Sequence, residues 1–512
     1  MKNSKIKNLI IVGGGTAGWM SAAALSRIIG KQNCKVTLIE SRQIGTVGVG
    51  EATIPPIVEF NNLLGINSDE MIRETNGTFK LGIEFINWGK IGDAYMHPFG
   101  SFGRTILNVS FWHYWKKAFD LGIAPGLQAY SLNWLAAKEN RFFRGAKIPN
   151  SPLTKIPHAY HFDANLYANF LREFSENLGV NRIEGDVKDV IQNSVSGFIE
   201  ELRLSDGSVV KGDFFIDCTG FKGLLIEQCL NTGYEDWSHV LPCDRALAVP
   251  SEAITPKHPY TKSIAHAIGW QWRIPLQHRT GNGMVYCSEF SDNQMAADIL
   301  LNNLPSTALS EPKNLRFKTG KRKKIWNKNC LSIGLASGFM EPLESTSIHL
   351  IQSTIMRFFS LFPHKADFEV EMNYFNNSID EEFKSIRDFL ILHYKLTTRD
   401  DSELWNYCRN MEIPDSLKEK LELYKSGSWI ERNNKELFGV DSWLAVLNGQ
   451  SAQANSYNPL VDTLPESELE KIMQDTREVL SQCASSMPDH EHFILNNCAS
   501  KNNHIAKNQS AL

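Results

Sequence analysis

The sequence lacks the features that mark several large classes of protein. Its 512 residues include nine cysteines, an odd number, and none of them forms a C-x-x-C pair. A zinc finger or a disulfide framework is therefore disfavoured, and the cysteines fit reduced thiols in a cytoplasmic protein. No apolar run approaches the roughly 18 residues of a membrane span. The basic first residues lead into glycines rather than into the apolar core of a signal peptide.

An excess of charge is also missing. The chain has 53 Lys and Arg against 57 Asp and Glu, a net charge of −4, without a basic block. Such a chain is a poor candidate for binding nucleic acid or an anionic membrane. No G-x-S-x-G motif is present, so nothing points to a nucleophilic hydrolase.

Two groups of histidines are interpreted as structural. His490 and His492 stand in a short polar run after a helix and lack a third spaced ligand, so we expect a solvated loop and no metal site. His158 and His161 precede the start of another predicted helix, where capping or packing is the expected role.

What is present begins with a strand, a glycine-rich turn, a helix and a second strand. The strands are predicted over residues 6–12 and 35–40 and the helix over 19–29, which makes a βαβ unit and hence a parallel sheet. Residues 198–204 and 209–211 read as a hairpin around Asp206-Gly207. The pattern predicts an α/β protein.

The later part of the chain is predicted to be mostly helical. A strand over 330–334 leads into a long helix beginning near residue 345, and residues 369–408, 414–424 and 466–483 follow as helical stretches. The last of these has an apolar face of Leu469, Ile472, Met473, Val479, Leu480 and Cys483. We therefore divide the chain into an α/β core over 1–365, a mostly helical region over 366–498 and a disordered tail over 499–512.

The glycine-rich turn carries a dinucleotide-binding pattern. Gly13, Gly15 and Gly18 form G-x-G-x-x-G directly after a strand and at the start of a helix, with Thr16 and Ala17 between them. The glycines allow a tight turn, close approach of a pyrophosphate and close packing of helix on strand. The helix start offers free N–H groups to the phosphates, and Glu40 at the end of the next strand can accept from ribose hydroxyls. The chain has one such fingerprint, which favours a bound flavin and reducing power from elsewhere.

Three further motifs make the pattern specific. They are G-V-G-E-A-T-I-P at residues 48–55, W-x-W-x-I-P formed by Trp270, Trp272, Ile274 and Pro275, and E-P-L-E-S-T-S-I at residues 341–348. Together with the glycine fingerprint, and in this order, they closely resemble the flavin-dependent tryptophan halogenase family, from about residue 6 to about 495. The resemblance implies an FAD-binding, Rossmann-like core of the flavin monooxygenase type, an added β-sheet and a helical C-terminal substrate region.

The resemblance also implies a mechanism. Members of the family take FADH2 from a separate reductase and react it with oxygen to a flavin hydroperoxide, which a bound halide attacks to give hypohalous acid. That oxidant travels through a tunnel to a lysine, which delivers electrophilic halogen to an aromatic ring. The tryptophan motif is thought to lie between flavin and substrate and to keep them apart.

Residues of this chain match the family's reactive groups. Lys80, in Phe-Lys-Leu-Gly, matches the catalytic lysine, and its apolar neighbours predict burial. Glu344 matches the second catalytic residue, which stabilises the arenium cation at the substrate and takes its proton. Thr346 and Ser347 match the backbone pair that binds chloride or bromide at a helix start, where the family usually has glycine at the second position.

Further matches concern the flavin and the substrate. Glu51, Val187, Leu335 and Ile348 correspond to flavin-side positions, and His97 and Phe99 correspond to the substrate pocket, where the phenylalanine stacks on an indole. Relatives that act on free tryptophan clamp its charged ends with adjacent tyrosines. In residues 428–462 the nearest counterpart here is Ser442-Trp443, so a bare indole or another electron-rich aromatic is an open alternative to tryptophan.

The leading hypothesis is therefore an FADH2-dependent halogenase of an electron-rich aromatic, with a flavin reductase as partner and a homodimer left open. The alternative is an aromatic hydroxylase with its own NAD(P)H half-reaction. A third class is a flavin-binding protein without catalysis, which would need none of Lys80, Glu344 and the tryptophan pair together.

Overall fold

The computed structural model describes residues 6–41, 50–363, 367–432 and 436–501. The chain divides into two compact units, each built from three segments. Unit 1 comprises residues 1–77, 162–244 and 316–383, and unit 2 comprises 78–161, 245–315 and 384–512. This differs from the predicted division at residue 365, because strands far apart in the sequence pair within each unit.

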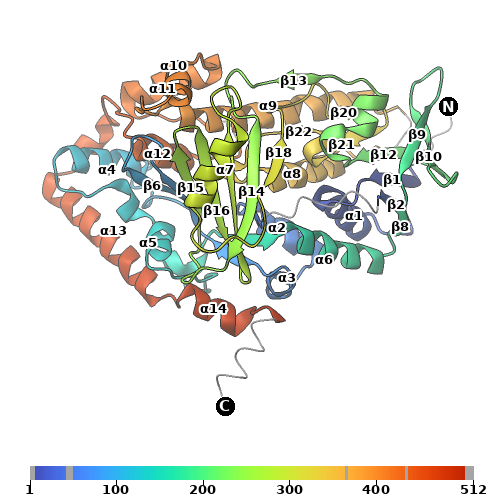
Figure 1. Ribbon diagram of the computed structural model, residues 1–512. Helices are drawn as coiled ribbons and strands as arrows, with labels where there is room; N and C mark the ends of the chain where they lie inside the picture. The colour runs from blue at the N-terminus through green and yellow to red at the C-terminus, as the bar shows by residue number, and fades with distance from the viewer. Residues whose placement is uncertain (1–5, 42–49, 364–366, 433–435, 502–512) are drawn as a thin grey trace. The chain divides into compact units, whose positions relative to one another are not determined.

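Unit 1 is centred on a sheet of mostly parallel strands (Figure 1). Its order is β20 (Trp326–Asn327), β21 (Cys330–Ser332), β12 (Phe214–Asp217), β1 (Asn8–Val12), β2 (Lys35–Glu40) and β8 (Asn181–Glu184). β1 pairs in parallel with β2 and with β12, as the βαβ pattern predicted. Ile10, Val12 and Phe215 from these strands are buried in one apolar cluster. Only β20 runs antiparallel to its neighbour among the described strands of this sheet.

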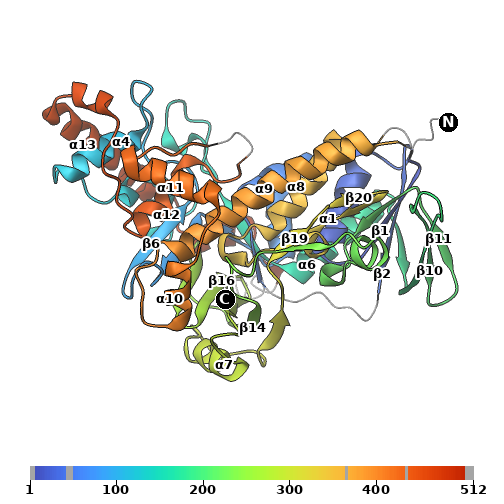
Figure 2. The ribbon, with the colours of Figure 1, turned by 90° about the horizontal axis from the view of Figure 1, so that it is seen from above.

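Small sheets and helices complete unit 1. The small sheets contain β9 (Val187–Gln192), β10 (Ile199–Leu204) and β11 (Val209–Lys211), and β13 (Tyr234–Asp236), β19 (Gly320–Arg322) and β22 (Gly338–Phe339). The helices are α1 (Thr16–Ile28), α2 (Pro56–Leu64), α3 (Ser68–Glu74), α6 (Ala164–Asn177), α8 (Ser347–Ser360) and the first part of α9 (Glu369–Lys395). α8 and α9 run side by side (Figure 2), joined through Glu382.

Unit 2 is built on an extended sheet of seven strands. Their order is β18 (Lys313–Arg316), β14 (Arg245–Glu252), β17 (Arg279–Tyr286), β16 (Gly269–Pro275), β15 (Thr261–His266), β5 (Gly82–Ile86) and β6 (Ala94–Pro98). α7 (Asn293–Asn302) lies against β14 and β17 (Figure 1), where its Ala296 and Leu300 pack on Met284 and Tyr286. A separate strand β4 (Thr78–Lys80) pairs with β7 (Ala159–Asp163).

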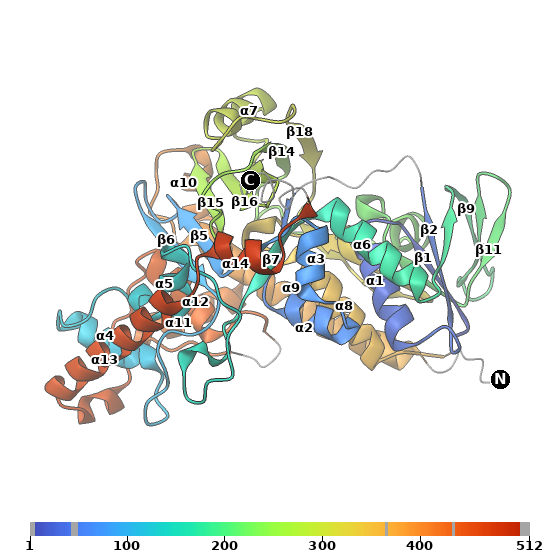
Figure 3. The same cartoon turned by 90° about the horizontal axis from the view of Figure 1, so that it is seen from below.

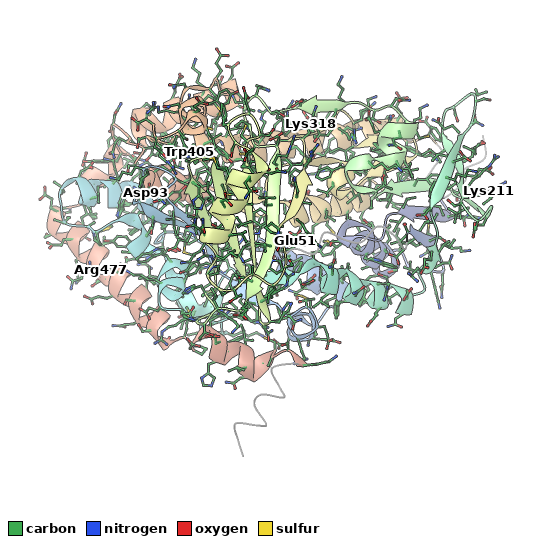
Figure 4. All side chains as sticks on the ribbon, viewed as in Figure 1. Glu51, Asp93, Lys211, Lys318, Trp405 and Arg477 are labelled. Atoms are coloured by element: carbon green, nitrogen blue, oxygen red, sulfur yellow. The ribbon has the colours of Figure 1, made fainter. Side chains whose placement is uncertain are left out.

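Unit 2 contains further helices, and those from α10 onward confirm the predicted helical C-terminal region. These further helices are α4 (Phe111–Asp120), α5 (Leu132–Lys138), α10 (Glu403–Asn410), α11 (Asp415–Gly427), α12 (Val440–Gly449), α13 (Glu466–Ser486) and α14 (His490–Asn497). Trp405 of α10, labelled in Figure 4, is fully buried and donates to the His266 carbonyl at 2.8 Å. No helix in the described ranges is long and apolar enough to cross a membrane.

Two details differ from expectation. Leu469, Met473 and Leu480 form the buried face of α13, but Val479 is 47% exposed, because the buried stripe is narrower than the one we expected. The predicted tail lies outside the described residues from 502 onward. Within its described start, Ala499 and Ser500 are buried, and the Ser500 N–H donates to the Gln277 side chain at 2.8 Å.

Candidate active site

The glycine-rich turn of unit 1 has the geometry of a nucleotide cradle. Gly13 has φ +112°, and a Cβ there would lie 2.2 Å from the Cys218 carbonyl oxygen. A Cβ on Gly18 would lie 1.8 Å from the Gly13 carbonyl oxygen. Gly15 is the extended residue before α1, whose first N–H groups have no acceptor inside the helix. These residues fit the pyrophosphate of a dinucleotide such as FAD.

Glu40 lies at the end of β2 beside this turn. Its carboxylate accepts from the Trp19 indole at 3.3 Å and pairs with Arg182. A Cβ on Gly14 would collide with Glu40 Oε2, so the glycine lets the carboxylate reach the turn. Since a carboxylate accepts several hydrogen bonds, these contacts orient Glu40 and leave capacity for ribose hydroxyls.

Other predicted flavin-side residues meet at Gly334. This residue has φ +69°, and a Cβ on it would lie 2.7 Å from Ala17 of α1 and 3.7 Å from Ile351 of α8. Leu335 follows in the same short turn, and Ile348 is buried in the first turn of α8. The structure therefore brings Ala17, Leu335 and the start of α8 together. It places Val187 elsewhere in unit 1, at the start of β9, where it pairs with Leu204.

The predicted halide pair stands at the start of α8. Ser345 is left-handed, with φ 57° and ψ 37°, and Thr346 is right-handed, with φ −87° and ψ −10°. Successive residues of opposite hand turn their backbone N–H groups into one concavity that attracts anions. The helix itself begins at Ser347, so its dipole adds to this potential. An anion such as halide fits without a charged side chain.

Two carboxyl groups of unit 1 are withdrawn from water to different degrees. Glu344, just before this turn, is fully buried. Glu51, labelled in Figure 4, lies in β3 (Gly50–Ala52), and burial raises its pKa to about 7. Glu51 is therefore part protonated near neutral pH and can both donate and accept a hydrogen bond. Gly48 and Val49 of the same motif lie outside the described residues.

Lys80 is the last residue of β4 in unit 2, and it is fully buried as its apolar neighbours predicted. The chain then passes from one sheet to another, because β5 begins at Gly82 and pairs with β6 and β15. The Lys80 ammonium lies 5.5 Å from the centre of the Phe99 ring, within cation–π range. His97, two residues earlier, is also buried and packs on Phe389 and Phe438. Lys80 and Phe99 thus lie together, and His97 stands two residues before Phe99 in the chain.

The tryptophan motif forms β16 of the same sheet. Trp270 and Trp272 point to one face and meet edge to face at 6.2 Å. Trp272 lies over Gly283 of β17, where a Cβ would be 2.0 Å from its ring. Trp270 packs on Trp88, and Ile274 and Pro275 are buried at the end of the strand. The motif is a rigid aromatic wall whose position depends on a glycine in the next strand.

The expectation of a loop at His490 and His492 is wrong, because both residues lie in α14 (His490–Asn497), and the expectation of exposure is wrong for His490. It is fully buried at the start of α14, whereas His492 is exposed. His490 accepts a hydrogen bond from the Phe79 N–H at 3.2 Å, next to Lys80 in sequence. In the described residues, no group of His, Cys, Asp or Glu has the arrangement of a metal site.

An ion cluster between α8 and α9 was not among the sequence-based expectations. Glu382 accepts from His349 at 2.8 Å, Ser353 at 2.9 Å and Arg357 at 2.9 Å. His349 stands in the first turn of α8, two residues after Ser347, so the cluster braces the helix at the predicted halide site. The spacing of His349, Ser353 and Arg357 by four residues is a signal in the sequence, but their common partner was not visible there.

Comparison with known proteins decides the family. The family model described as tryptophan halogenase matches residues 8–466. The chain belongs to the tryptophan halogenase family. This halogenase is 35% identical to "Tryptophan 6-halogenase ThaL" of Streptomyces albogriseolus over 453 residues, which cover 83% of each chain.

Solved structures agree with the family. This halogenase superposes on Xcc4156, a flavin-dependent halogenase from Xanthomonas campestris, with a TM-score of 0.94 and 44% identity, covering 97% of this chain and 99% of that one. BrvH, a flavin-dependent halogenase from Brevundimonas sp. BAL3, gives a TM-score of 0.92 and 40% identity, and the superposition covers 96% of this chain and 99% of BrvH. The chain is therefore a flavin-dependent halogenase with the expected FAD-binding α/β fold, and the hydroxylase alternative is not favoured.

Proposed function

We propose that this halogenase uses Lys80 to deliver halogen from hypohalous acid to an electron-rich aromatic ring. The observation that carries the proposal is the full burial of the Lys80 side chain beside Phe99. Most lysines are solvated, and an ammonium kept away from water polarises a small neutral oxidant more strongly than one in water.

The cofactor is held by residues of unit 1. Gly13, Gly15 and the first turn of α1 would bind the pyrophosphate of FAD, and Glu40 would bind its ribose. When bound in its reduced form, FAD supplies with O2 the two-electron oxidation that converts halide into hypohalous acid. The N–H groups at Thr346 and Ser347 would hold chloride or bromide. The reduced flavin comes from a separate reductase, because the sequence contains one dinucleotide fingerprint.

The transfer step converts hypohalous acid and the aromatic ring into the halogenated ring and water, and it needs no other reagent. The Lys80 ammonium donates a hydrogen bond to the oxygen of the hypohalous acid and weakens its bond to halogen. A ring carbon attacks the halogen, the new carbon–halogen bond forms, and the departing oxygen leaves as water after taking a proton from Lys80. Glu344 is assigned to stabilise the ring cation and to take the proton it loses, and the proton then returns to Lys80 through solvent.

The substrate that fits this proposal is an indole without the charged ends of an amino acid. Trp443, at the predicted clamp position, is already occupied by protein contacts, with Phe389 at 5.1 Å and the Lys420 ammonium at 4.5 Å from its ring. Tyr457 in the same window donates to Asp462 at 3.1 Å. The sequence has no adjacent tyrosines in this window, and these contacts already engage the two aromatic residues that could replace them. Several relatives are named as tryptophan halogenases, so tryptophan is the comparison substrate.

The experiment compares Lys80→Ala with the wild type, on indole and on tryptophan, with saturating reductase. We expect Lys80→Ala to lose aromatic halogenation by at least about 100-fold, since it removes the group that activates the oxidant. Flavin binding and the release of hypohalous acid, measured with a chemical trap, should persist. Unchanged halogenation by Lys80→Ala would show that free hypohalous acid does the chemistry.

A further inference from the structure

The strand that carries Lys80 is held by two buried histidines. Thr78, two residues before Lys80 and on the same face of β4, lies opposite His161 of β7. Its hydroxyl is 2.7 Å from the Pro275 carbonyl oxygen and 2.9 Å from His161 Nδ1. On the other side of the ring, His161 Nε2 is 2.9 Å from the Thr261 hydroxyl. His161 thus joins the Lys80 strand to the end of the tryptophan motif and to the start of β15.

The hydrogen bonds determine which nitrogen of His161 carries the proton. A carbonyl oxygen can only accept, so the single hydrogen of the Thr78 hydroxyl goes to Pro275. The hydroxyl oxygen must then accept from His161 Nδ1–H. Burial, together with the nearby charge of Lys80, holds the pKa of His161 well below its usual value, so the ring is neutral. Its Nε2 therefore carries a lone pair and accepts from Thr261.

His490 makes the equivalent contact from the last described helix. The Phe79 N–H can only donate, so His490 Nε2 accepts. His490 Nδ1 then donates to the Lys257 carbonyl oxygen at 2.6 Å. Burial lowers the pKa of His490 to about 4, so this ring is also neutral at ordinary pH. Figure 3 shows α14 next to β7, the partner of β4.

We propose that His161 and His490 are positioning residues for Lys80. Each ring, protonated on Nδ1, fixes a residue of β4, one through the Thr78 hydroxyl and the other through the Phe79 amide. Because both rings are neutral, they fix the strand without placing a second positive charge beside the ammonium. The inference rests on the proposed role of Lys80. A displacement of about 1 Å in a reacting group can cost on the order of 100-fold in rate, so fixing this strand matters for transfer.

The test uses Thr78→Val, which keeps the shape but removes the hydroxyl, and Thr78→Ser, which keeps the hydroxyl. The full chain receives reduced FAD from a reductase, with Lys80→Ala as reference. We expect Thr78→Val to lower aromatic product roughly 10- to 100-fold, while trapped hypohalous acid per O2 consumed rises toward the Lys80→Ala value. Thr78→Ser should stay within a few-fold of wild type in both. His490→Gln, which keeps an acceptor, and His490→Leu, which does not, form a second matched pair.

Each result decides between defined alternatives. The positioning role is overturned by one combination of results. In it, Lys80→Ala loses aromatic product, but the ratio of aromatic product to trapped hypohalous acid in Thr78→Val equals that of the wild type. Thr78→Val could instead lose flavin binding, hypohalous acid and aromatic product together while Thr78→Ser keeps all three. That result would show that the Thr78 hydroxyl is needed only for folding, and it would also overturn the positioning role. Unchanged product from Lys80→Ala would overturn the proposed function instead.

A spectroscopic measurement tests the geometry without activity or further variants. The measurement is the nitrogen NMR spectrum of the wild-type chain labelled with 15N-histidine. His161 and His490 should each show a protonated Nδ1 and an unprotonated Nε2 over about one pH unit on either side of pH 7. Thr78→Ser should keep the His161 pattern. A protonated Nε2 on either ring, or a ring that titrates in this range, would contradict the proposed arrangement.

Discussion

Glu382 shows how much one residue can support in this protein. It is almost fully buried between α8 and α9, where it accepts from His349, Ser353 and Arg357. Burial raises the pKa of its carboxyl, but the hydrogen bond and charge of His349 and the charge of Arg357 outweigh it and lower the pKa to about 2. The carboxylate is therefore charged in the folded protein down to strongly acidic pH.

This pKa predicts how stability depends on pH. In the unfolded chain a glutamate titrates near 4.3, above its value in the folded state. Its contribution is therefore complete above about pH 4.3 and is lost as the pH falls toward about 2. We expect Glu382→Gln to lower the free energy of unfolding by about 1.5–3 kcal/mol near neutral pH, because it removes the charge partner of the half-buried Arg357 and weakens the hydrogen bonds to it. The difference from wild type should shrink below pH 4.

Thermal unfolding followed by circular dichroism between pH 3 and pH 7 measures this difference. Glu381→Gln, one residue earlier and exposed, is the matched control and should change stability by less than about 0.5 kcal/mol. Equal melting temperatures for Glu382→Gln and Glu381→Gln would mean that the cluster does not stabilise unit 1.

Single residues could be predicted from the sequence where their neighbours in the chain indicate burial or a motif. Residues whose hydrogen-bond partners lie far away in the sequence could not. The burial of Lys80 was predicted because its neighbours in the sequence are apolar. His161 gave a weaker signal, as a polar residue in a strand whose every side chain is buried. His490 gave none, because its partner Phe79 lies 411 residues away and the residues around it are polar. Hydrogen bonds across such distances depend on the fold, which a local pattern does not contain.

Among the elements, α8 has a start whose backbone geometry suits an anion. Left-handed Ser345 and right-handed Thr346 precede its first residue, Ser347, so the N–H groups of Thr346 and Ser347 lie at the positive end of the helix and in an anion-binding turn. The sequence resemblance to the family implies glycine at the position of Ser347. Since the backbone supplies the donors, the serine does not remove the proposed site.

Substitution at residue 347 tests this helix start. Proline is tolerated in the first turn of a helix but has no N–H, so Ser347→Pro should weaken halide binding by about 10-fold, the equivalent of one lost hydrogen bond to a charged group. Ser347→Gly keeps the N–H and should leave halide binding within about twofold. The apparent affinity for bromide and chloride, from steady-state halogenation, measures the effect.

Flavin binding and the melting temperature of Ser347→Pro serve as controls, because proline also restricts the preceding Thr346. If both are intact and halide affinity is still that of the wild type, halide does not bind at this turn.

Elements were predicted better than their boundaries. The second strand and the strand at 209–211 agree with the structure in every residue, and the first helix begins three residues earlier than expected, at Thr16. The apolar run of the second strand identifies it, because its inner residues are buried. The strand at 209–211 is mostly exposed and is identified instead by the Asp206-Gly207 turn before it. The exposed Val479 shows the opposite case, since the side of α13 that meets solvent depends on which helices pack against it.

For the whole molecule, the interleaved units were not predictable from local pattern. Lys80 belongs to unit 2 although the chain on both sides of its segment belongs to unit 1. The residues matched to flavin and halide lie in unit 1, and those matched to the tryptophan wall and the lysine lie in unit 2. Only long-range strand pairing, such as that of β5 with β15, determines this division.

A further prediction concerns the supply of electrons to the whole protein. The sequence contains one G-x-G-x-x-G fingerprint, and the proposed site assigns it to FAD. The purified chain with FAD should therefore not oxidise NADPH or NADH above the rate of free FAD. Halogenation should begin when a flavin reductase is added. The absorbance of NAD(P)H at 340 nm measures its oxidation, and the reductase alone is the control. Rapid NADPH oxidation by the pure chain would identify a self-sufficient enzyme.

The contact between Phe79 and His490 also has a consequence for synthesis. A ribosome that has just made the Lys80 strand must add several hundred more residues before the acceptor for the Phe79 amide exists. N-terminal segments fold first during translation, so this strand waits until α14 emerges. A chain released early would contain the nucleotide cradle, the halide turn and the lysine, but it would lack one of the two imidazoles that fix the lysine in place. The emergence of α14 is thereby coupled to the completion of the reactive strand.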